Sequence, residues 1–382
     1  MNFVFFIHSV ASDWNHGNAH FVRGVLSDLL QRGHDVTVFE QQDNWSRWYL
    51  EQDHGKDASS AYLDAYPQLA GVAHDYTLPP GTNERFPTAA HVDEVAAALD
   101  LDVMLREADV VIVHEWTAPS LVAAIGRHHE THDHYRLLFH DTHHRVVSEP
   151  KAMAAFDLSG YDGVLAFGDV LREAYRRRKT VPHAWTWHEA ADTNLFKPLH
   201  SEMSRDLVWI GNWGDGERTA QLHEFLLGPV KALGLSARVH GVRYPDDAKN
   251  ALADAGMEFA GYLPNHRAPQ AFAEARVTVH VPRQFYVTHL PGIPTVRPFE
   301  ALACSIPLVC SPWYDSEGLF TAGRDYLMAA DGAEMRVQLK RVLEEPGLRE
   351  DLIGHGLETI RTRHTCRHRV DELLTYLDQL PG

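Results

Sequence analysis

Short apolar runs alternate with amphipathic stretches along most of the chain. Apolar runs bounded by turn residues are typical of buried strands, and a 3.6-residue apolar period between them is typical of helices that cover a sheet. The strands predicted in the first half are residues 3–7, 36–39, 110–113, 137–139 and 164–167. Those predicted in the second half are residues 207–210, 237–240, 277–281 and 308–310. This alternation predicts an α/β protein with two doubly wound, Rossmann-like parallel-sheet domains that face a cleft.

The boundary between the two series of strands lies near Pro198, in the polar segment NLFKPLHSEMSRD. We therefore predict a first domain at residues 1–200, a second domain at residues 201–362 and a C-terminal helix at residues 363–382. Residues 43–87 fit neither series, because they hold tryptophans and tyrosines among Gly, Pro, Asp and Ser with weak periodicity. We interpret them as a helical or looped excursion whose aromatic side chains either bind a ligand or pack onto the first domain.

Charge and composition exclude several classes of function. The 382 residues carry a formal net charge of −17, which argues against a general electrostatic attraction to nucleic acid or anionic lipid. Three cysteines provide no disulfide framework and are typical of a reducing compartment. No apolar run has the roughly 18 residues that span a bilayer, and the first residues lack the cationic region of a secretion signal. The sequence predicts a cytoplasmic protein without a transmembrane segment or a nucleic-acid partner.

Ligands of doubly wound sheets bind beyond the carboxyl ends of the strands. After the first strand, Gly17, Asn18 and His20 open a helix whose free N–H groups suit an anion or a sugar hydroxyl, although a plain capping loop explains them as well. His140 directly follows the strand at residues 137–139, and we expect it to hydrogen-bond a neutral ligand.

Two histidine-rich stretches, HHETHDH at residues 128–134 and HDTHHR at residues 140–145, also offer ligands for zinc. No cysteine accompanies them and the HExxH spacing is absent. Solvated turns explain both stretches equally simply, so no metal site is predicted.

The second domain opens with a glycine-rich strand end. Its first strand runs into Gly211 and Asn212, and the next helix begins near Arg218. Backbone N–H groups beside a fixed cation suit a diphosphate, and a structural turn with a solvated arginine is the alternative. Arg283 and Arg297 also stand near strand ends. Three such arginines in an acidic chain predict a site for an anionic ligand.

A further segment, IPTVRPFEALACSIPLVC at residues 293–310, places Glu300 in the opening turns of a predicted helix. A carboxylate there either faces the helix dipole or binds a ligand. The part FEALACSIPLV resembles the donor segment EAxAxGxPVV of retaining GT-B glycosyltransferases, the group with glycogen synthases and bacterial mannosyltransferases, and more closely its CgeB-type members. WHEAADTNLFKP, at residues 187–198, resembles the stretch that closes the first domain of that group, with Asp192 in the aspartate position.

The resemblance implies a role for single residues. Glu300 would bind the ribose hydroxyls of the nucleotide, His140 would touch the donor sugar, and the loop HGNAHF at residues 16–21 would lie near the acceptor and the donor phosphates. Where the group has a second, sugar-binding glutamate, eight positions before the first, this chain has Gly292. The backbone of residues 292–295 is expected to take its place.

The same resemblance implies a metal-independent, retaining, hexosyltransferase-like enzyme. It would move a sugar from a nucleoside diphosphate, UDP by default, to an acceptor hydroxyl, with no cofactor besides the donor. The first domain would bind the acceptor, the second would bind the nucleotide sugar, and the last helix would cross back to the first domain. The predicted catalytic residues are His140, Arg218 and Arg283. The predicted substrate-binding residues are Gly17, Asn18, His20, Gly211, Asn212, Gly292, Ile293, Pro294, Thr295, Arg297 and Glu300.

Nothing in the sequence selects the base, the sugar or the acceptor, which can be a glycan, a lipid, a protein or a small metabolite. Two alternatives stay open. One is a sugar-nucleotide epimerase or hydrolase on the same fold, which would use an acidic residue such as Asp141. The other is a sugar-nucleotide-binding partner protein without turnover. The glycine at position 292, in place of a glutamate, supports this alternative.

Overall fold

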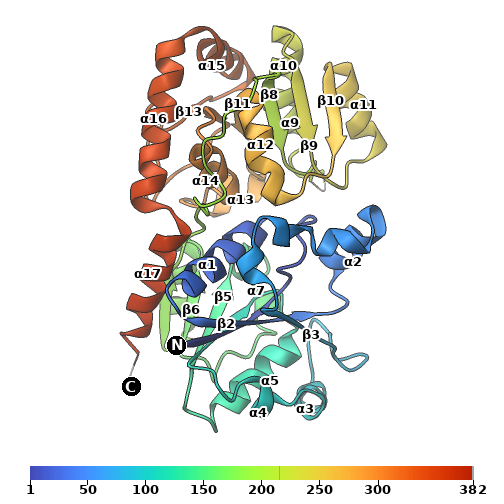
Figure 1. Cartoon of the computed structure of the whole chain (residues 1–382), viewed down its shortest axis with the longest axis vertical. Coiled ribbons are helices and arrows are strands. Elements are labelled where there is room, and N and C mark those ends of the chain that lie inside the picture. The colour runs from blue at the N-terminus through green and yellow to red at the C-terminus, as the bar shows by residue number, and fades with distance from the viewer. Residues whose placement is uncertain (215, 381–382) are drawn as a thin grey trace. The chain divides into compact units, whose positions relative to one another are not determined.

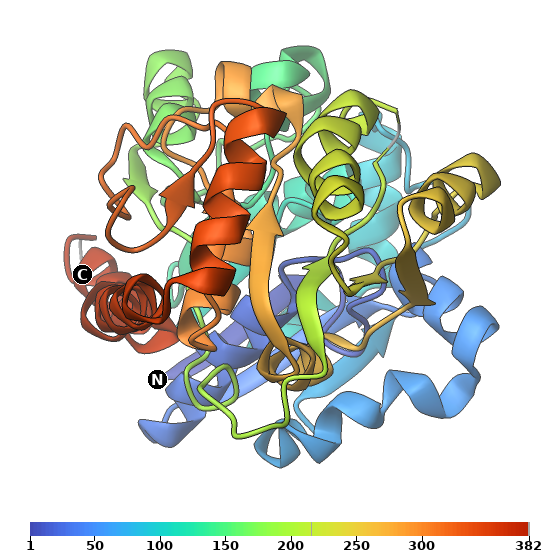
Figure 2. The same ribbon diagram turned by 90° about the horizontal axis from the view of Figure 1, so that it is seen from above.

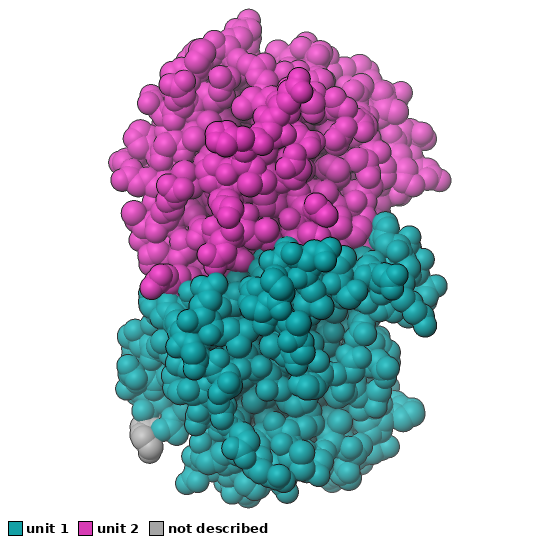
Figure 3. Space-filling model, viewed as in Figure 1, with its two compact units in different colours: residues 1–13, 22–188, 369–382 teal, residues 14–21, 189–368 magenta. Residues whose placement is uncertain are grey.

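The computed structural model describes residues 1–214 and 216–380, and the chain forms two compact units. The first unit consists of Met1–Asp13, Val22–His188 and Arg369–Gly382, and the second of Trp14–Phe21 and Glu189–His368 (Figure 3). Residues 14–21 and 189–200, which the sequence places in the first domain, thus belong to the second unit. The last two residues of the predicted C-terminal helix, 381 and 382, lie outside the described residues.

The first unit contains a parallel seven-stranded sheet (Figure 1). Its strands are β1 (Asn2–Ile7), β2 (Asp35–Gln41), β3 (Ala73–Tyr76), β4 (Val110–His114), β5 (Arg136–Asp141), β6 (Gly163–Ala166) and β7 (His183–Thr186), in the order β3-β2-β1-β4-β5-β6-β7. Neighbouring strands pair in parallel throughout. The central strands β1 and β4 are apolar and almost wholly buried, as expected for a parallel sheet covered on both faces.

Helices connect these strands. They are α1 (Ala19–Gln31), α2 (Trp45–His54), α3 (Ala89–Ala98), α4 (Leu101–Met104), α5 (Pro119–His129), α6 (Arg145–Ser148), α7 (Pro150–Met153), α8 (Asp169–Arg178) and, at the C-terminus, α17 (Cys366–Leu377), with 3-10 turns η1 (Lys56–Ser59), η2 (Ala61–Asp64) and η3 (Pro67–Leu69). Within the first unit, hydrogen bonds join α17 to the end of β7 and the residue that follows it. Trp187 Nε1 donates to the carbonyl of Arg369 at 2.7 Å, and Tyr376 Oη donates to the carbonyl of Thr186 at 2.8 Å.

The second unit contains a parallel six-stranded sheet. Its strands are β8 (Arg205–Ile210), β9 (Ala237–His240), β10 (Met257–Gly261), β11 (Ala275–His280), β12 (Leu308–Cys310) and β13 (Leu327–Met328), in the order β10-β9-β8-β11-β12-β13. Its helices are α9 (Thr219–Leu222), α10 (Gly228–Leu233), α11 (Asp246–Asp254), α12 (Ala268–Ala273), α13 (Gln284–His289), α14 (Val296–Ala303), α15 (Gly332–Glu344) and α16 (Pro346–Arg363), with the π-helical turn η4 (His223–Leu227) and the 3-10 turn η5 (Asn265–Arg267).

Helices cover both faces of this second sheet. Alternate residues of β8 therefore pack into two different cores. Leu207 and Trp209 belong to a core that includes Met335 of α15. Val208 belongs to another core, which includes Phe299 of α14. Seen from above, helices lie on either side of β8 and β11 (Figure 2). The second unit is therefore a doubly wound sheet, as predicted.

Each predicted strand is present, and the strands that the sequence did not predict lie toward the sheet edges. β3 has the sequence AHDY and β13 has two residues, so neither shows an apolar run. The predicted excursion at residues 43–87 holds α2 and three 3-10 turns, but its β3 is the edge strand of the first sheet. Tyr62 and Tyr66 of this segment are buried, whereas Trp48 and Tyr49 are exposed.

The strand order reverses direction at one place in each sheet. In the first unit this point lies between β1 and β4, and in the second between β8 and β11. Loops that leave the carboxyl ends of these strands are the usual ligand-binding loops of doubly wound sheets. Among the described residues, no helix combines the length and the apolarity needed to cross a membrane.

Candidate functional site

The loop after β8 is organised by the side chain of Arg218. Its Nη1 donates to the carbonyl of Val281, which follows β11, at 3.0 Å, and its other nitrogens donate to the carbonyls of Asn212 and Trp213. The guanidinium carbon lies 5.5 Å from the ring centre of Trp209. Gly214, at φ +89°, lets the backbone pass close to the arginine side chain. Arg218 therefore links the two loops of the reversal point in the second unit.

Arg218 holds a positive charge without a matching acid. Within residues 1–214 and 216–380, no carboxylate lies within ion-pair distance of its guanidinium, which donates only to carbonyls. Burial, together with the nearby charges of Arg283 and Arg297, lowers the pKa of Arg218 to about 10. Arg283 itself lies 3.9 Å from Glu217. Positive charges that repel one another in this way favour a bound anion.

Helix α14 begins at a strained residue. Thr295, its N-cap, has φ +61°, which a β-branched side chain rarely adopts. Its Oγ1 lies 3.4 Å from His280 Nε2, at the end of β11. Burial and the charges of Arg218 and Arg297 lower the pKa of His280 to about 3, so this imidazole is neutral at neutral pH. Strain of this kind gathers at binding sites, where surrounding structure enforces it.

Glu300 is fully buried within α14 and lies among polar and charged side chains. Its Oε1 lies 2.9 Å from His20 Nδ1 and accepts from Asn265 Nδ2 at 2.8 Å, while Oε2 pairs with Arg297. Burial alone would raise the pKa of Glu300, but the charges of Arg297 and His20 outweigh burial and hold it below its ordinary value. The carboxylate is therefore charged and already satisfied by the protein, and a nucleotide hydroxyl would have to share or replace one of these partners.

A second carboxyl group lies beside Glu300. Glu189 is fully buried, and burial together with the charge of Glu300 raises its pKa to about 8. The sequence did not single out Glu189, because it follows β7, a half-buried strand without a long apolar run.

Gly292 leaves room for the acidic side chain of another residue. It has φ +87°, and a Cβ built on it would lie 2.6 Å from Glu317 Oε1 and 2.8 Å from Ser316 Oγ. Its N–H donates to the carbonyl of Tyr314 at 2.7 Å. A side chain at position 292 is therefore excluded by conformation and by space, and the carboxylate of Glu317 occupies the place where it would begin.

The loop at residues 14–21 belongs to this same unit and contacts the loops just described. Asn15 Oδ1 accepts a hydrogen bond from Asn212 Nδ2. A Cβ at Gly17 would lie 3.7 Å from Val296, the first residue of α14. His20 Nε2 lies 3.1 Å from the carbonyl of Ala190. The predicted loop therefore meets the predicted donor segment.

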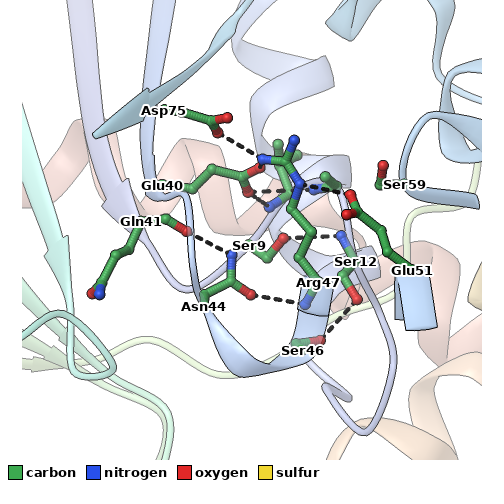
Figure 4. A network of polar contacts seen from close by, with 12 residues as sticks. Ser9, Ser12, Glu40, Gln41, Asn44, Ser46, Arg47, Glu51, Ser59 and Asp75 are labelled. Atoms are coloured by element: carbon green, nitrogen blue, oxygen red, sulfur yellow. Dashed lines mark hydrogen bonds and ion pairs between the residues drawn. The ribbon is translucent and has the colours of Figure 1, made fainter. Parts of the chain in front are cut away.

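The first unit positions its own reversal-point loop through Glu40 (Figure 4). This carboxylate ends β2, is buried, and accepts from the N–H groups of Val10 at 2.7 Å and Ala11 at 3.4 Å. Burial raises its pKa. Arg47 of α2 lies 3.4 Å from Glu40 Oε1, and also pairs with Glu51 and Asp75. These contacts fasten the loop after β1 to α2.

His140 lies at the end of β5 in the first unit. It is buried, and its ring packs against His114 with centroids 5.2 Å apart and against Trp187 at 4.8 Å. Burial lowers its pKa to about 3. The prediction of a histidine that acts as a neutral hydrogen-bonding group fits this environment, although its role stays a prediction.

Buried acids gather beside His140. Glu115, after β4, lies 2.7 Å from Arg145 Nη2, and Asp141 accepts from Tyr175 Oη at 2.7 Å. Burial raises the pKa of both carboxyl groups, and their mutual proximity raises that of Glu115 further. Glu115, Trp116 and Arg145 line a cavity of about 210 Å³ with Asn83, Met153 and Phe156. Arg145 lies over the ring of Trp116 at 4.4 Å.

The second unit thus holds most of the predicted site residues. They are Gly17, Asn18, His20, Gly211, Asn212, Arg218, Arg283, Gly292, Ile293, Pro294, Thr295, Arg297 and Glu300, and direct contacts join many of them. His140 belongs to the first unit. The residues that sequence reasoning missed are Asn15, Glu115, Glu189, Asn265, His280 and Glu317.

Arg218, Arg283 and α14 fall within a region of known type. Residues 218–375 match the family model described as Glycosyl transferase-like. This region is a glycosyl transferase-like domain. A comparison with curated protein sequences found no match.

Solved structures extend the similarity over the whole chain. Anabaena Alr3699/HepE, in complex with UDP and glucose, has 13% identity and a TM-score of 0.69, with 100% of each chain covered. Sucrose-phosphate synthase from Thermosynechococcus elongatus has 13% identity and a TM-score of 0.68, with 99% of this chain and 98% of that chain covered. T4 phage BGT, in complex with UDP and Mn²⁺, has 12% identity and a TM-score of 0.59, with 99% of each chain covered.

At these identities the structures show the fold. The two parallel sheets and their helices are those of GT-B glycosyltransferases, so the predicted fold class is confirmed. The family match over residues 218–375 and the fold together confirm the recognition of a GT-B glycosyltransferase, and its retaining mechanism stays a prediction. Membership of the CgeB-type subgroup stays a prediction.

Proposed function

We propose that the protein transfers a sugar from a nucleoside diphosphate to an acceptor hydroxyl, with retention of the anomeric configuration. The donor diphosphate binds at the loops after β8 and β11 in the second unit. The observation that carries this proposal is Arg218, whose guanidinium bridges both loops and lacks an acidic partner among the described residues. A diphosphate would place negative charge opposite Arg218, next to Arg283, which lies 3.9 Å from Glu217, and Arg297, which pairs with Glu300.

The chemistry follows from that charge. As the bond between the anomeric carbon and the diphosphate oxygen breaks, negative charge grows on the leaving group, and Arg218 and Arg283 stabilise it. The acceptor oxygen bonds to the anomeric carbon on the same face, and its proton passes to the departing diphosphate. No pair of glycosidase-like carboxyl groups is needed for this step. His140, neutral because of its burial, is a hydrogen-bond partner for the sugar in this proposal.

Glu300 and Glu317 orient the donor in this proposal. Glu300 accepts hydrogen bonds from the ribose hydroxyls, which replace or join Asn265 in the present network. Glu317 reads the sugar, since its carboxylate stands where a side chain at position 292 would begin. In this proposal an acidic group remains beside position 292, but a different part of the chain provides it.

UDP is the proposed nucleotide, because it is bound in the HepE and BGT structures similar to this chain. We also propose that transfer needs no metal ion, because arginines stand at the diphosphate position. T4 phage BGT was solved with Mn²⁺, so this point needs its own test. Initial rates should stay within about twofold between excess chelator and added Mn²⁺, and a tenfold dependence on Mn²⁺ would contradict it. The buried thiols of Cys304, Cys310 and Cys366 support a cytoplasmic location.

The decisive experiment incubates the full chain with UDP-, GDP- and dTDP-sugars and measures diphosphate release with and without candidate acceptors. Release that depends on an acceptor, together with an α-to-α or β-to-β product by NMR, supports the proposal. The Arg218→Ala variant should lose this release, while the exposed control Arg336→Ala keeps it.

A sugar-nucleotide epimerase or hydrolase is the second candidate. The observation that favours it is the pair of buried acids Glu115 and Asp141, whose raised pKa values suit proton transfer. Conversion of the donor without any acceptor, abolished in Asp141→Asn, would favour this reaction. Tight binding of a nucleotide sugar without any conversion would instead indicate a binding partner protein.

A further inference from the structure

A cluster of metal-ligating side chains lies outside the candidate site, in the first unit. Asp102 belongs to the short helix α4, His128 to the last turn of α5, and His132 to the turn that follows α5. One potential ligand atom from each residue lies within 4.8 Å of the others. None of the three residues has a part in the proposed transfer reaction.

Both imidazoles direct the same nitrogen toward one carboxylate oxygen. His128 Nε2 lies 3.1 Å from Asp102 Oδ1, and His132 Nε2 lies 3.7 Å from the same oxygen. The two rings are stacked with centroids 4.0 Å apart. Three ligand atoms of two residue types therefore surround one small volume.

The opposite nitrogen of each ring is held by the protein. His128 Nδ1 lies 2.9 Å from Tyr135 Oη. His132 Nδ1 lies 3.0 Å from the carbonyl of His128 and 3.0 Å from Thr131 Oγ1. Such partners fix the ring orientation of metal-binding histidines in proteins.

The contact with the carbonyl of His128 determines which nitrogen of the His132 ring carries the proton. A carbonyl oxygen only accepts, so Nδ1 of His132 carries the proton and, in the neutral ring, Nε2 presents a lone pair. That lone pair faces the carboxylate of Asp102, which is also an acceptor. A cation between the two, either a proton or a metal ion, removes this repulsion.

We propose that Asp102, His128 and His132 bind a divalent transition-metal ion of the zinc class, with water at the remaining position. Two imidazole nitrogens favour Zn²⁺, Ni²⁺ or Cu²⁺ over Mg²⁺ and Ca²⁺, which prefer oxygen ligands. The side chains of Asp102 and His132 are 73% and 42% exposed, so an ion can reach the cluster from solvent. The bound ion joins α4 to the end of α5 and stabilises the folded first unit.

Calorimetric titration of the chelator-stripped full chain with ZnCl₂ tests the proposal. Wild type should show one strong site, and His132→Asn and Asp102→Asn should each weaken it at least about tenfold. The exposed His74 lies outside the cluster, so His74→Asn is the matched control and should keep wild-type affinity. Equal affinity in all four proteins, or no strong site in wild type, would overturn the proposal.

Thermal unfolding supplies an independent readout and separates a metal ion from a proton. Saturating Zn²⁺ should raise the Tm of wild type and of His74→Asn, and Mg²⁺ should not. The rise should be lost in His132→Asn and Asp102→Asn, whose replaced side chains are exposed enough to leave the fold intact. An equal rise in these variants, or an equal rise with Mg²⁺, would show that the ion binds elsewhere.

Discussion

The loops at the carboxyl ends of the central strands differ in charge between the two units. In the second unit, Arg218 and Arg283 lie in the loops after β8 and β11, and Arg297 lies in the first turn of α14. In the first unit, Glu115 follows β4 and Asp141 ends β5, and Arg145 pairs with Glu115. Both sheets are parallel and doubly wound.

The difference shows that the fold determines where a ligand site can lie, and that the side chains of the loops determine which ligand suits it. One set of loops is suited to a ligand with several negative charges, because it gathers three arginines, of which Arg218 donates only to backbone carbonyls among the described residues. The other set pairs its charges internally, through Glu115 with Arg145 and Tyr175 with Asp141. The first set is the one that we propose to bind an anion, and the second is at least partly satisfied without a ligand.

The sharpest test of this contrast removes the central cation. Arg218→Ala should lower kcat about 100- to 1,000-fold, equivalent to about 2 to 4 kcal/mol, because the leaving diphosphate loses a preorganised donor. Steady-state turnover with the best donor and acceptor pair measures the effect. The exposed Arg336→Ala should stay within twofold of wild type. Unchanged turnover in Arg218→Ala would remove this residue from the site.

The buried acid Glu189 makes the second unit sensitive to pH. Its pKa is raised to about 8 in the folded protein, so between pH 5 and pH 8 the folded chain keeps a proton that the unfolded chain releases. Stability should therefore fall as pH rises through this window, by about 3 kcal/mol from this group. Urea unfolding at both pH values measures the loss.

Glu189→Gln should unfold with a smaller pH dependence than wild type, because the amide does not titrate. The control is the exposed Glu350→Gln, which should keep the wild-type slope. Parallel slopes in wild type and Glu189→Gln would mean that Glu189 is not protonated in the folded chain at neutral pH.

Removing a charged side chain from the acidic loops of the first unit should lower the free energy of unfolding more than removing Arg218 from the arginine loops. Glu115→Ala leaves Arg145 without its acid, so the free energy of unfolding should fall by about 1 to 3 kcal/mol. Denaturant unfolding compares this variant with Arg218→Ala. If Glu115→Ala is as stable as wild type, the pair with Arg145 has no structural role.

The smallest expected effect concerns Glu317. Glu317→Gln should raise the KM for the donor about tenfold while UDP alone binds with unchanged affinity, because the carboxylate is proposed to contact the sugar rather than the nucleotide. Inhibition by UDP is measured alongside KM. A parallel loss of UDP affinity would place Glu317 at the nucleotide instead, and no change in either would exclude it from the donor site.

Strands and loop positions were predictable because they depend on local patterns. An apolar run such as residues 110–113 specifies a buried strand by itself, and Gly211 and Arg218 follow such a run directly. β3, with the sequence AHDY, carries no such pattern, and it lies at the edge of the sheet, where it pairs with β2. The sequence therefore defined the sheet centres better than their edges.

The partners of the predicted residues were not predictable, because they depend on distant parts of the chain. Glu300 was singled out from its own segment, but its contacts His20 and Asn265 lie far from it in sequence. Glu317 stands twenty-five positions after Gly292, and its carboxylate occupies the space that a side chain on that glycine would need. No spacing rule connects such residues.

Residues 14–21 have a consequence for dissecting the protein. They group with the second unit although the chain on both sides of them groups with the first. A fragment cut at residues 189–368 would therefore lack His20 and leave one oxygen of Glu300 with fewer contacts. Recombinant halves made by a single cut would separate residues that group together, and an exchange of the second unit between relatives would have to include residues 14–21 as well.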